Sequence, residues 1–439
     1  MPLLLVAAAV LALLVLMVLF RLNAFLSLIV VALCLGVAEG MPVKEAINSV
    51  QNGIGSTLGS IALIIGFGSM LGTLISDSGA AQRISLSLIR KFGIRYIQWA
   101  MILTGFLVGL PMFYNAGFIL LIPLVFSVAA STGLPLLFVG LPMAASLSVT
   151  HGYLPPHPGP TSIAVIYQAD IGLTLMYGLV VAIPAIIIAG PLFTRFLGRF
   201  NASPPAGLAA PRIFTDEEMP GYGVSVFTAV FPVILMAMAT LASALLPEDS
   251  PLRRVLEVVG DPAIALLLSV FLAIYTLGIS RGRKMDEIMA LLTGSISSIA
   301  MIMLIIGGGG ALKQVLVDSG VGDYITTLVK DMSLSPLLLA WSIAALLRVC
   351  LGSATVAAIT TAGITLPVIA ATGVSPELMV LATGAGSLMF SHVNDPGFWM
   401  FKEYFSLSIP DTIATWSIME TIVSVVGLLG VLALSVFVG

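Results

Sequence analysis

The three histidines of the chain lie in two proline- and glycine-containing segments that interrupt apolar sequence, residues 150–160 and 391–399. Histidine titrates near neutral pH, and a carboxylate removed from water must find a partner or take up a proton. We therefore regard His151, His392 and Asp395 as candidate proton-coupling groups. Each histidine could equally be a hydrogen-bonded core residue without a chemical role.

Two further segments, 110–117 and 351–356, place helix-breaking Pro or Gly next to small polar residues. Backbone groups freed at such breaks are tolerated in lipid only where they face protein or a cavity. Asn115, Ser353 and Thr355 lie in these segments and could hydrogen-bond the hydroxyl groups of a polyhydroxylated ligand. Close packing of helices through small residues is the alternative explanation.

Arg348 follows a long apolar run and immediately precedes the second of these breaks. Its guanidinium could bind a carboxylate in a bidentate arrangement. It could equally neutralise Asp395 or extend to a membrane interface, and the sequence leaves these alternatives open. Thr150, His151 and Asn394 complete the set of candidate substrate-binding residues.

The composition indicates what kind of scaffold must position these residues. Of the 439 residues, 59% are hydrophobic and only 9% are charged, whereas soluble domains carry about 25% charged residues. Apolar stretches long enough to cross a bilayer, roughly 20 residues each, recur along the chain. The sequence therefore predicts an all-α integral membrane protein embedded in the lipid bilayer.

Charge, cysteine content and connection lengths argue against other classes. A net charge of −3 is too small to indicate a nucleic-acid partner. The two cysteines form neither a disulfide framework nor a metal-binding spacing, and the histidines lack an H-E-x-x-H pattern. We expect no metal and no other cofactor. The longest polar connections have no room for an ATPase domain, so ATP-driven pumping is not predicted.

The apolar stretches give a set of predicted membrane spans, which are 2–20, 24–39, 57–76, 97–112, 134–150, 173–194, 222–247, 260–280, 295–316, 335–350, 376–391 and 415–438. Two further apolar stretches, 116–131 and 352–372, are too short or too interrupted to be read as simple crossings.

An internal repeat relates the two halves of the chain. The matching pairs share one offset (318 − 77 = 241) and are Leu63-Ile64-Ile65-Gly66 with Leu304-Ile305-Ile306-Gly307, Asp77-Ser78-Gly79 with Asp318-Ser319-Gly320, and His151 with His392. Three matches at one offset are difficult to obtain by chance, so the chain is expected to contain two structurally related copies.

The charges beside the first span of each copy predict that the copies are inverted. Basic residues mark cytoplasmic loops. In the first copy they follow that span, at 83–95, whereas in the second copy they precede it, at 281–284. Both termini are then expected outside. Inverted repeats with broken helices are typical of secondary transporters, whose sites lie near the middle of the membrane. The predicted organisation is N-terminal scaffold spans (1–40), repeat 1 (41–197), a cytoplasmic linker (198–221), linking scaffold spans (222–281) and repeat 2 (282–439).

Three long motifs resemble the gluconate permease family, within the larger ion-transporter superfamily. They are SVTHGYLPPHPGP at 148–160, GSATVAA at 352–358 and SHVNDPGFW at 391–399, and the resemblance extends over nearly the whole chain. It implies a symporter of protons with gluconate, or a relative such as idonate, in the inner (cytoplasmic) membrane. It also implies inverted repeats with re-entrant hairpins, a scaffold part and a transport part, elevator-like movement, and a homodimer.

One position departs from the family pattern, since family members often have an acidic residue where this chain has Asn115. A carboxylate in the membrane can carry a proton, whereas an amide cannot titrate. Position 115 is therefore a fourth candidate position for proton coupling, beside His151, His392 and Asp395. Either coupling rests on those other groups, or this chain binds and exchanges its substrate without coupling.

We therefore predict a secondary transporter for a sugar-acid anion, and not an enzyme. Ser353, Thr355 and Asn115 would bind the substrate's hydroxyls, while Arg348 or backbone amides at helix N-termini would bind its carboxylate. The competing hypotheses are a membrane-embedded enzyme that uses a metal or the same His and Asp side chains, and a membrane sensor. The lack of a soluble signalling domain argues against the sensor.

Overall fold

The computed structural model describes residues 2–204, 214–321, 335–393 and 395–438, and these ranges contain helices and connections but no strand. By length and composition, seven of the described helices can cross a membrane, or up to nine if each bent pair counts as one span. The prediction of an all-α, multi-pass membrane protein is confirmed.

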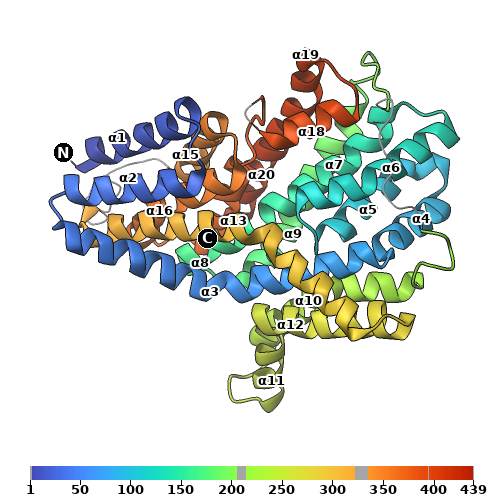
Figure 1. Cartoon of the computed structure of the whole chain (residues 1–439), viewed down its shortest axis with the longest axis horizontal. Coiled ribbons are helices and arrows are strands. Elements are labelled where there is room, and N and C mark those ends of the chain that lie inside the picture. The colour runs from blue at the N-terminus through green and yellow to red at the C-terminus, as the bar shows by residue number, and fades with distance from the viewer. Residues whose placement is uncertain (1, 205–213, 322–334, 394, 439) are drawn as a thin grey trace.

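The helices are named in chain order, with η for short 3-10 or π turns (Figure 1). The first half contains α1 (Pro2–Leu14), η1 (Val15–Leu19), α2 (Ala24–Ala38), α3 (Val43–Asp77), α4 (Ala80–Phe92), η2 (Ile94–Tyr96), α5 (Ile97–Gly109), α6 (Tyr114–Thr132), α7 (Leu136–Tyr153), α8 (Pro158–Tyr167), α9 (Ile171–Ile187) and η3 (Ile188–Leu192). The second half contains α10 (Tyr222–Leu245), α11 (Pro251–Val259), α12 (Pro262–Ala273), η4 (Ile274–Gly278), η5 (Ile279–Arg281), α13 (Met285–Asp318), α15 (Pro336–Leu351), α16 (Ala354–Thr372), α17 (Pro376–Gly386), α18 (Pro396–Tyr404), α19 (Ile409–Thr412), η6 (Ile413–Ser417) and α20 (Ile418–Val438).

The two long helices α3 and α13, of 35 and 34 residues, lie side by side and antiparallel (Figure 1). Arg283, just before α13, donates to the carboxylate of Asp77 at the end of α3. At the other end of the pair, the Ser49 hydroxyl donates to Asp318 (2.6 Å). Gly53 permits the close contact, because a Cβ there would lie 2.8 Å from the Cα of Ala311.

Both helices begin well before the spans predicted for them, 57–76 and 295–316. The preceding residues include polar side chains, which lower the hydropathy of the sequence but do not interrupt the backbone hydrogen bonds of a helix. The stretch 352–372 also differs from expectation, whereas 116–131 lies in a helix that is not among those long and apolar enough to cross a membrane. These stretches form α16 and α6, respectively, each a helix of 19 residues, and α16 is long and apolar enough to cross a membrane.

The core surrounds α7, which is buried along almost its whole length and packs against α5, α6, α9 and η3. A helix that is apolar on all sides is stable only where protein or lipid surrounds it. Outer helices instead expose large apolar side chains, including Ile183 on α9, Phe227 on α10 and Phe271 on α12. These outward-facing side chains suit contact with lipid.

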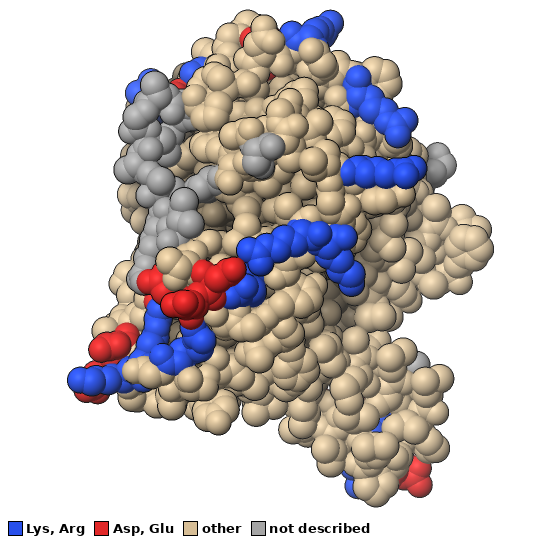
Figure 2. Space-filling view, turned by 90° about the vertical axis from the view of Figure 1, so that its right-hand side faces the viewer, with Lys and Arg blue, Asp and Glu red and all other residues tan. Residues whose placement is uncertain are grey.

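One end of the molecule gathers basic side chains beside a small acidic group (Figure 2). Here Arg83 pairs with Asp216 (3.0 Å), and Arg281 donates to the carbonyl oxygen of Glu217 (2.8 Å). Arg283 bonds Asp77 at the same end of the α3–α13 pair. The basic segments that the sequence assigned to the cytoplasm thus meet within one network.

Candidate functional site

Two breaks between helices form the centre of the site. α5 ends at Gly109 and α6 begins at Tyr114. Phe113, the residue immediately before α6, has an extended backbone (φ −62°, ψ 148°). α15 ends at Leu351, and Gly352 (φ 73°) adopts the left-handed conformation that favours glycine at a helix end. Both interruptions agree with the breaks predicted from the sequence.

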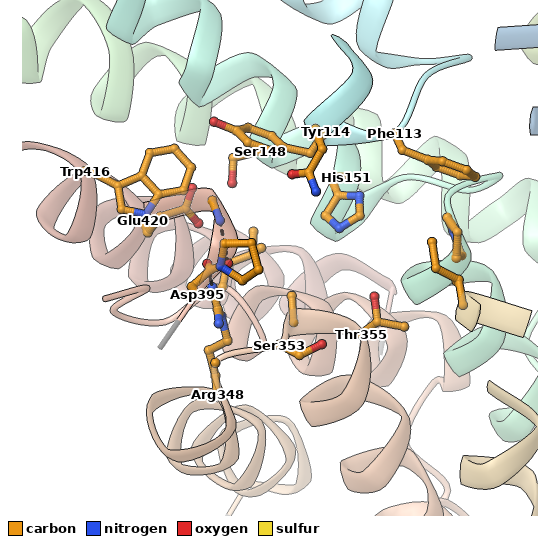
Figure 3. A pocket seen from close by; sticks show the side chains of 18 residues that line it. Phe113, Tyr114, Ser148, His151, Arg348, Ser353, Thr355, Asp395, Trp416 and Glu420 are labelled. Carbon is orange, nitrogen blue, oxygen red and sulfur yellow. Dashed lines mark hydrogen bonds and ion pairs between the residues drawn. The ribbon is translucent and has the colours of Figure 1, made fainter. Parts of the chain in front are cut away.

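The two breaks border one cavity of about 260 Å³ (Figure 3). Its walls come from helices of both halves of the chain, which are α6, α7, α8, α13, α15, α16, α18, η6 and α20, and from the segments just before α6 and α18. The segments around His151 and Asp395, far apart in sequence, face this same space. The site therefore combines elements from both halves of the chain.

Four helices begin at this cavity. Tyr114 of α6, Pro158 of α8, Ala354 of α16 and Pro396 of α18 are the first residues of their helices, and all four line it. The first N–H groups of a helix have no partner within the helix, and its N-terminus carries partial positive charge. Their arrangement around one space favours an anionic ligand.

Arg348 is the cation of the cavity, and it is only 3% exposed. Its Nη2 donates to the carboxylate of Asp395, which also accepts from the Ser391 hydroxyl and from the Gly397 N–H (2.8 Å). The structural pair is therefore present, while the buried Nε and Nη1 atoms of Arg348 have no acceptor among the described residues.

The aromatic wall of the cavity also fixes the loop before α18. Trp416 lines the cavity, and its Nε1 donates to the Ser391 hydroxyl (2.8 Å). Ser417 donates to the carbonyl oxygen of Ser391 (2.5 Å). The Trp416 ring packs against Tyr114, with 5.5 Å between ring centroids. This network holds Asp395 in place from the side opposite Arg348's helix.

Glu420, which the sequence analysis did not single out, also faces the cavity. It lies in the first turn of α20 and is only 2% exposed. Its Oε1 has no hydrogen-bond partner among the described residues, and the Ser148 hydroxyl interacts with its carboxyl group (Figure 3). A signal existed, because Glu420 is the one acidic residue of an apolar helix, and such residues are functional candidates by default.

The histidines occupy different positions relative to the cavity. His151 lines it, and its Nδ1 has no hydrogen-bond partner among the described residues. His157 lies behind it, with Nε2 2.7 Å from the carbonyl oxygen of Gly109. His392 is not part of the lining, and its Nε2 lies 2.8 Å from the carbonyl oxygen of Val349. His157 and His392 thus each contact the last turn of a helix that precedes a break.

Three predicted polar residues line the cavity at the starts of two helices. Asn115 is in the first turn of α6 and is exposed, while Ser353 and Thr355 flank the start of α16 and are partly buried. Ser353 also caps α16, since its hydroxyl accepts from the Val356 N–H (3.4 Å). The lining therefore offers amide and hydroxyl groups beside Arg348.

Thr150 is not among the residues that line the cavity. It is buried, and its hydroxyl donates to the carbonyl oxygen of Leu147 (2.9 Å). Asn394 lies outside the described residues. Over the described ranges, no group of three or more His, Cys, Asp or Glu side chains is placed to hold a metal ion.

Comparison with known proteins gives a family match over nearly the whole chain. The family model described as "GntP family permease" matches residues 1–437. The chain is 57% identical to the high-affinity gluconate transporter of Escherichia coli and 57% identical to the Gnt-II system L-idonate transporter of the same organism, over 100% and 99% of both chains. It is 49% identical to the gluconate permease of Bacillus subtilis, over 100% of both chains.

Two solved structures share the fold at low sequence identity. The Alcanivorax borkumensis YdaH transporter superposes with a TM-score of 0.68 and 19% identity, covering 94% of this chain and 97% of that one. Neisseria gonorrhoeae MtrF, described in its title with a class of antimetabolite efflux pumps, gives a TM-score of 0.65 and 16% identity over 93% of each chain. At these identities the likeness concerns the fold alone.

Proposed function

The chain belongs to the GntP permease family, and from that membership we propose that it carries gluconate, or a related sugar acid such as idonate, across the cytoplasmic membrane together with protons. The membership confirms the resemblance predicted from the three sequence motifs. It also agrees with the prediction that the chain is not an enzyme, because the relatives compared above are named transporters or permeases.

The observation that carries the proposed substrate class is the chemistry of the cavity. A sugar acid has a carboxylate at one end and hydroxyl groups along its length. The Arg348 guanidinium and the helix N-termini at the cavity suit the carboxylate. Asn115, Ser353 and Thr355 suit the hydroxyls, and all three line the same cavity as Arg348. Figure 3 shows Ser353 and Thr355 at this cavity. His151 adds a polar group on the α7 side.

Proton coupling requires a titratable group that can gain and lose a proton as the substrate binds and leaves. Among the predicted carriers, His151 and Asp395 line the cavity, whereas His392 contacts a backbone carbonyl outside it. Asn115 lines the cavity but cannot titrate. Coupling through a group that faces the substrate is supported by this arrangement, because substrate charge and proton then interact directly.

Two inverted repeats and an elevator-like movement complete the proposed mechanism, with the organisation predicted from the sequence (1–40, 41–197, 198–221, 222–281 and 282–439). The antiparallel α3–α13 pair supports it, since Asp77 and Asp318, equivalent in the repeat, lie at opposite ends of that pair. We also propose a homodimer, which molar-mass measurement by light scattering in detergent can test.

Gluconate uptake into proteoliposomes with an inward proton gradient tests the function. The expected result is accumulation above the external concentration, abolished by a protonophore, with gluconate exchange retained when the gradient is absent. Protein that neither binds nor exchanges any sugar acid would exclude the substrate class. Exchange without accumulation would support the uncoupled alternative that Asn115 raised.

A further inference from the structure

The two carboxyl groups of the cavity have unequal surroundings. Asp395 has a cation, Arg348, and accepts from the Ser391 hydroxyl and the Gly397 N–H. Glu420 has the Ser148 hydroxyl but no paired cation, and its Oε1 has no hydrogen-bond partner among the described residues. Both groups line the same space. Arg348, the positive charge of the site, is therefore already paired with Asp395. The carboxyl group of Glu420 remains without a cation and faces the space that a substrate would occupy.

Few other charges lie near this second carboxyl. The charged or titratable groups that face Glu420 or line the same cavity are Arg348 on α15, Asp395 before α18, Tyr114 on α6, and His151 and Tyr153 on α7. The Tyr153 hydroxyl is occupied, since it donates to the carbonyl oxygen of Val423. α9 and η3, which pack against α20, contain no Asp, Glu, Lys, Arg or His. The acidic residue of α17, Glu377, accepts instead from a backbone N–H just before α9 (3.0 Å).

We propose that Glu420 is the binding site of the coupled proton: it is protonated when a sugar acid is bound, and it is ionised only when the cavity is empty and the pH is high enough to remove the proton. This inference rests on the proposed function and adds the identity of the proton-binding group. The proton comes from the side on which the substrate enters and leaves to the side on which the substrate is released.

A count of charges gives the reason for the coupling. When Glu420 is ionised, the empty cavity has one cation facing two carboxylates, so one negative charge is in excess. A substrate anion would add a second excess charge in surroundings of low dielectric, where like charges repel strongly. Protonation of Glu420 restores the charge of the empty cavity. One proton would therefore accompany each substrate anion, and Asp395 would remain ionised beside Arg348 throughout.

Proton uptake on gluconate binding tests this directly, with purified protein in weakly buffered detergent solution and a pH indicator. At a pH above the range in which Glu420 is protonated in the empty cavity, the unmodified chain is expected to take up about one proton per gluconate bound, and the gluconate Kd should rise by up to about tenfold per pH unit. Glu420→Gln is expected to bind gluconate without proton uptake and with little pH dependence. Glu403→Gln, which removes an exposed carboxylate from α18, serves as the matched control and should behave as the unmodified chain.

The outcomes separate this inference from the proposed function. An unmodified chain that binds no sugar acid contradicts the function itself. Gluconate binding with equal proton uptake in Glu420→Gln and the unmodified chain overturns the role of Glu420 and leaves the function standing. If Glu420→Gln does not fold, Glu420→Asp replaces it, since the shorter side chain withdraws the carboxyl from the cavity. A shifted pH dependence of the gluconate Kd then supports the proposal, and an unchanged one overturns it.

Discussion

The imidazole Nε2 of His392 lies 2.8 Å from the carbonyl oxygen of Val349, in the last turn of α15. His157 makes the corresponding contact with Gly109 at the end of α5, at 2.7 Å. The last carbonyl groups of a helix have no partner within it. Each histidine therefore stabilises a helix end from a neighbouring segment, and each sits beside a break that opens into the cavity. These two side chains position the site without forming its surface.

Replacing His392 by Ala should accordingly weaken the scaffold and leave proton coupling intact. Loss of one hydrogen bond costs about 1 kcal/mol, so the melting temperature in detergent should fall by a few degrees. The gluconate Kd should rise modestly, while its pH dependence stays unchanged. His392→Gln, which can still donate, should recover part of the stability. A lost pH dependence in His392→Ala would instead make His392 a proton carrier.

Variants of the Arg348–Asp395 pair can separate the two roles of Arg348, which are neutralising Asp395 and binding the substrate carboxylate. Arg348→Ala leaves a buried carboxylate without its cation and should cost about 3–5 kcal/mol of stability. Adding Asp395→Asn removes that charge, so the double variant should melt well above the single one. Both variants should bind gluconate much more weakly, because the guanidinium that faces its carboxylate is gone. Normal gluconate binding by the double variant would show that Arg348 serves only as the partner of Asp395.

Thr355→Val tests whether the hydroxyl groups near the start of α16 contact the substrate. Valine keeps the shape of threonine but removes its hydroxyl, which should cost about 1 kcal/mol of binding, or about fivefold in the gluconate Kd. Thr355→Ser keeps the hydroxyl and is the matched control. Ser353 is less suitable, because its hydroxyl also caps α16. Equal gluconate affinities for Thr355→Val and the unmodified chain would place Thr355 outside the contact surface.

The sequence predicted the breaks and much of the site because helix-breaking residues and isolated polar groups are conspicuous in apolar sequence. It could not choose between the roles of Arg348, since both depend on how close the loop before α18 comes to α15. The lengths of α3 and α13 were also underestimated. Hydropathy indicates whether side chains contact lipid or water, but it does not show where the backbone hydrogen bonds of a helix end. Glu420 was missed although its type and context were visible. It is the single acidic residue of the last helix, and no motif of the sequence includes it.

The orientation predicted from loop charges can be tested with single cysteines in a Cys34→Ser, Cys350→Ser background. Arg90 belongs to the basic end of the molecule, and Asp249 lies between α10 and α11. In intact cells, a membrane-impermeant maleimide should label Asp249→Cys and not Arg90→Cys, and disruption of the cells should expose both. The reverse labelling pattern would invert the assignment.

Asn115→Glu brings a further titratable group to the cavity, at the start of α6. If Glu420 already carries the coupled proton, the new carboxylate adds repulsion for the substrate. The gluconate Kd should then rise at neutral pH and recover as acid protonates the added group. The unmodified chain should still concentrate gluconate in proteoliposomes, and Asn115→Gln, which adds length without charge, separates the effect of size. If only Asn115→Glu concentrates gluconate while both chains exchange it, position 115 carries the coupling proton and Glu420 does not.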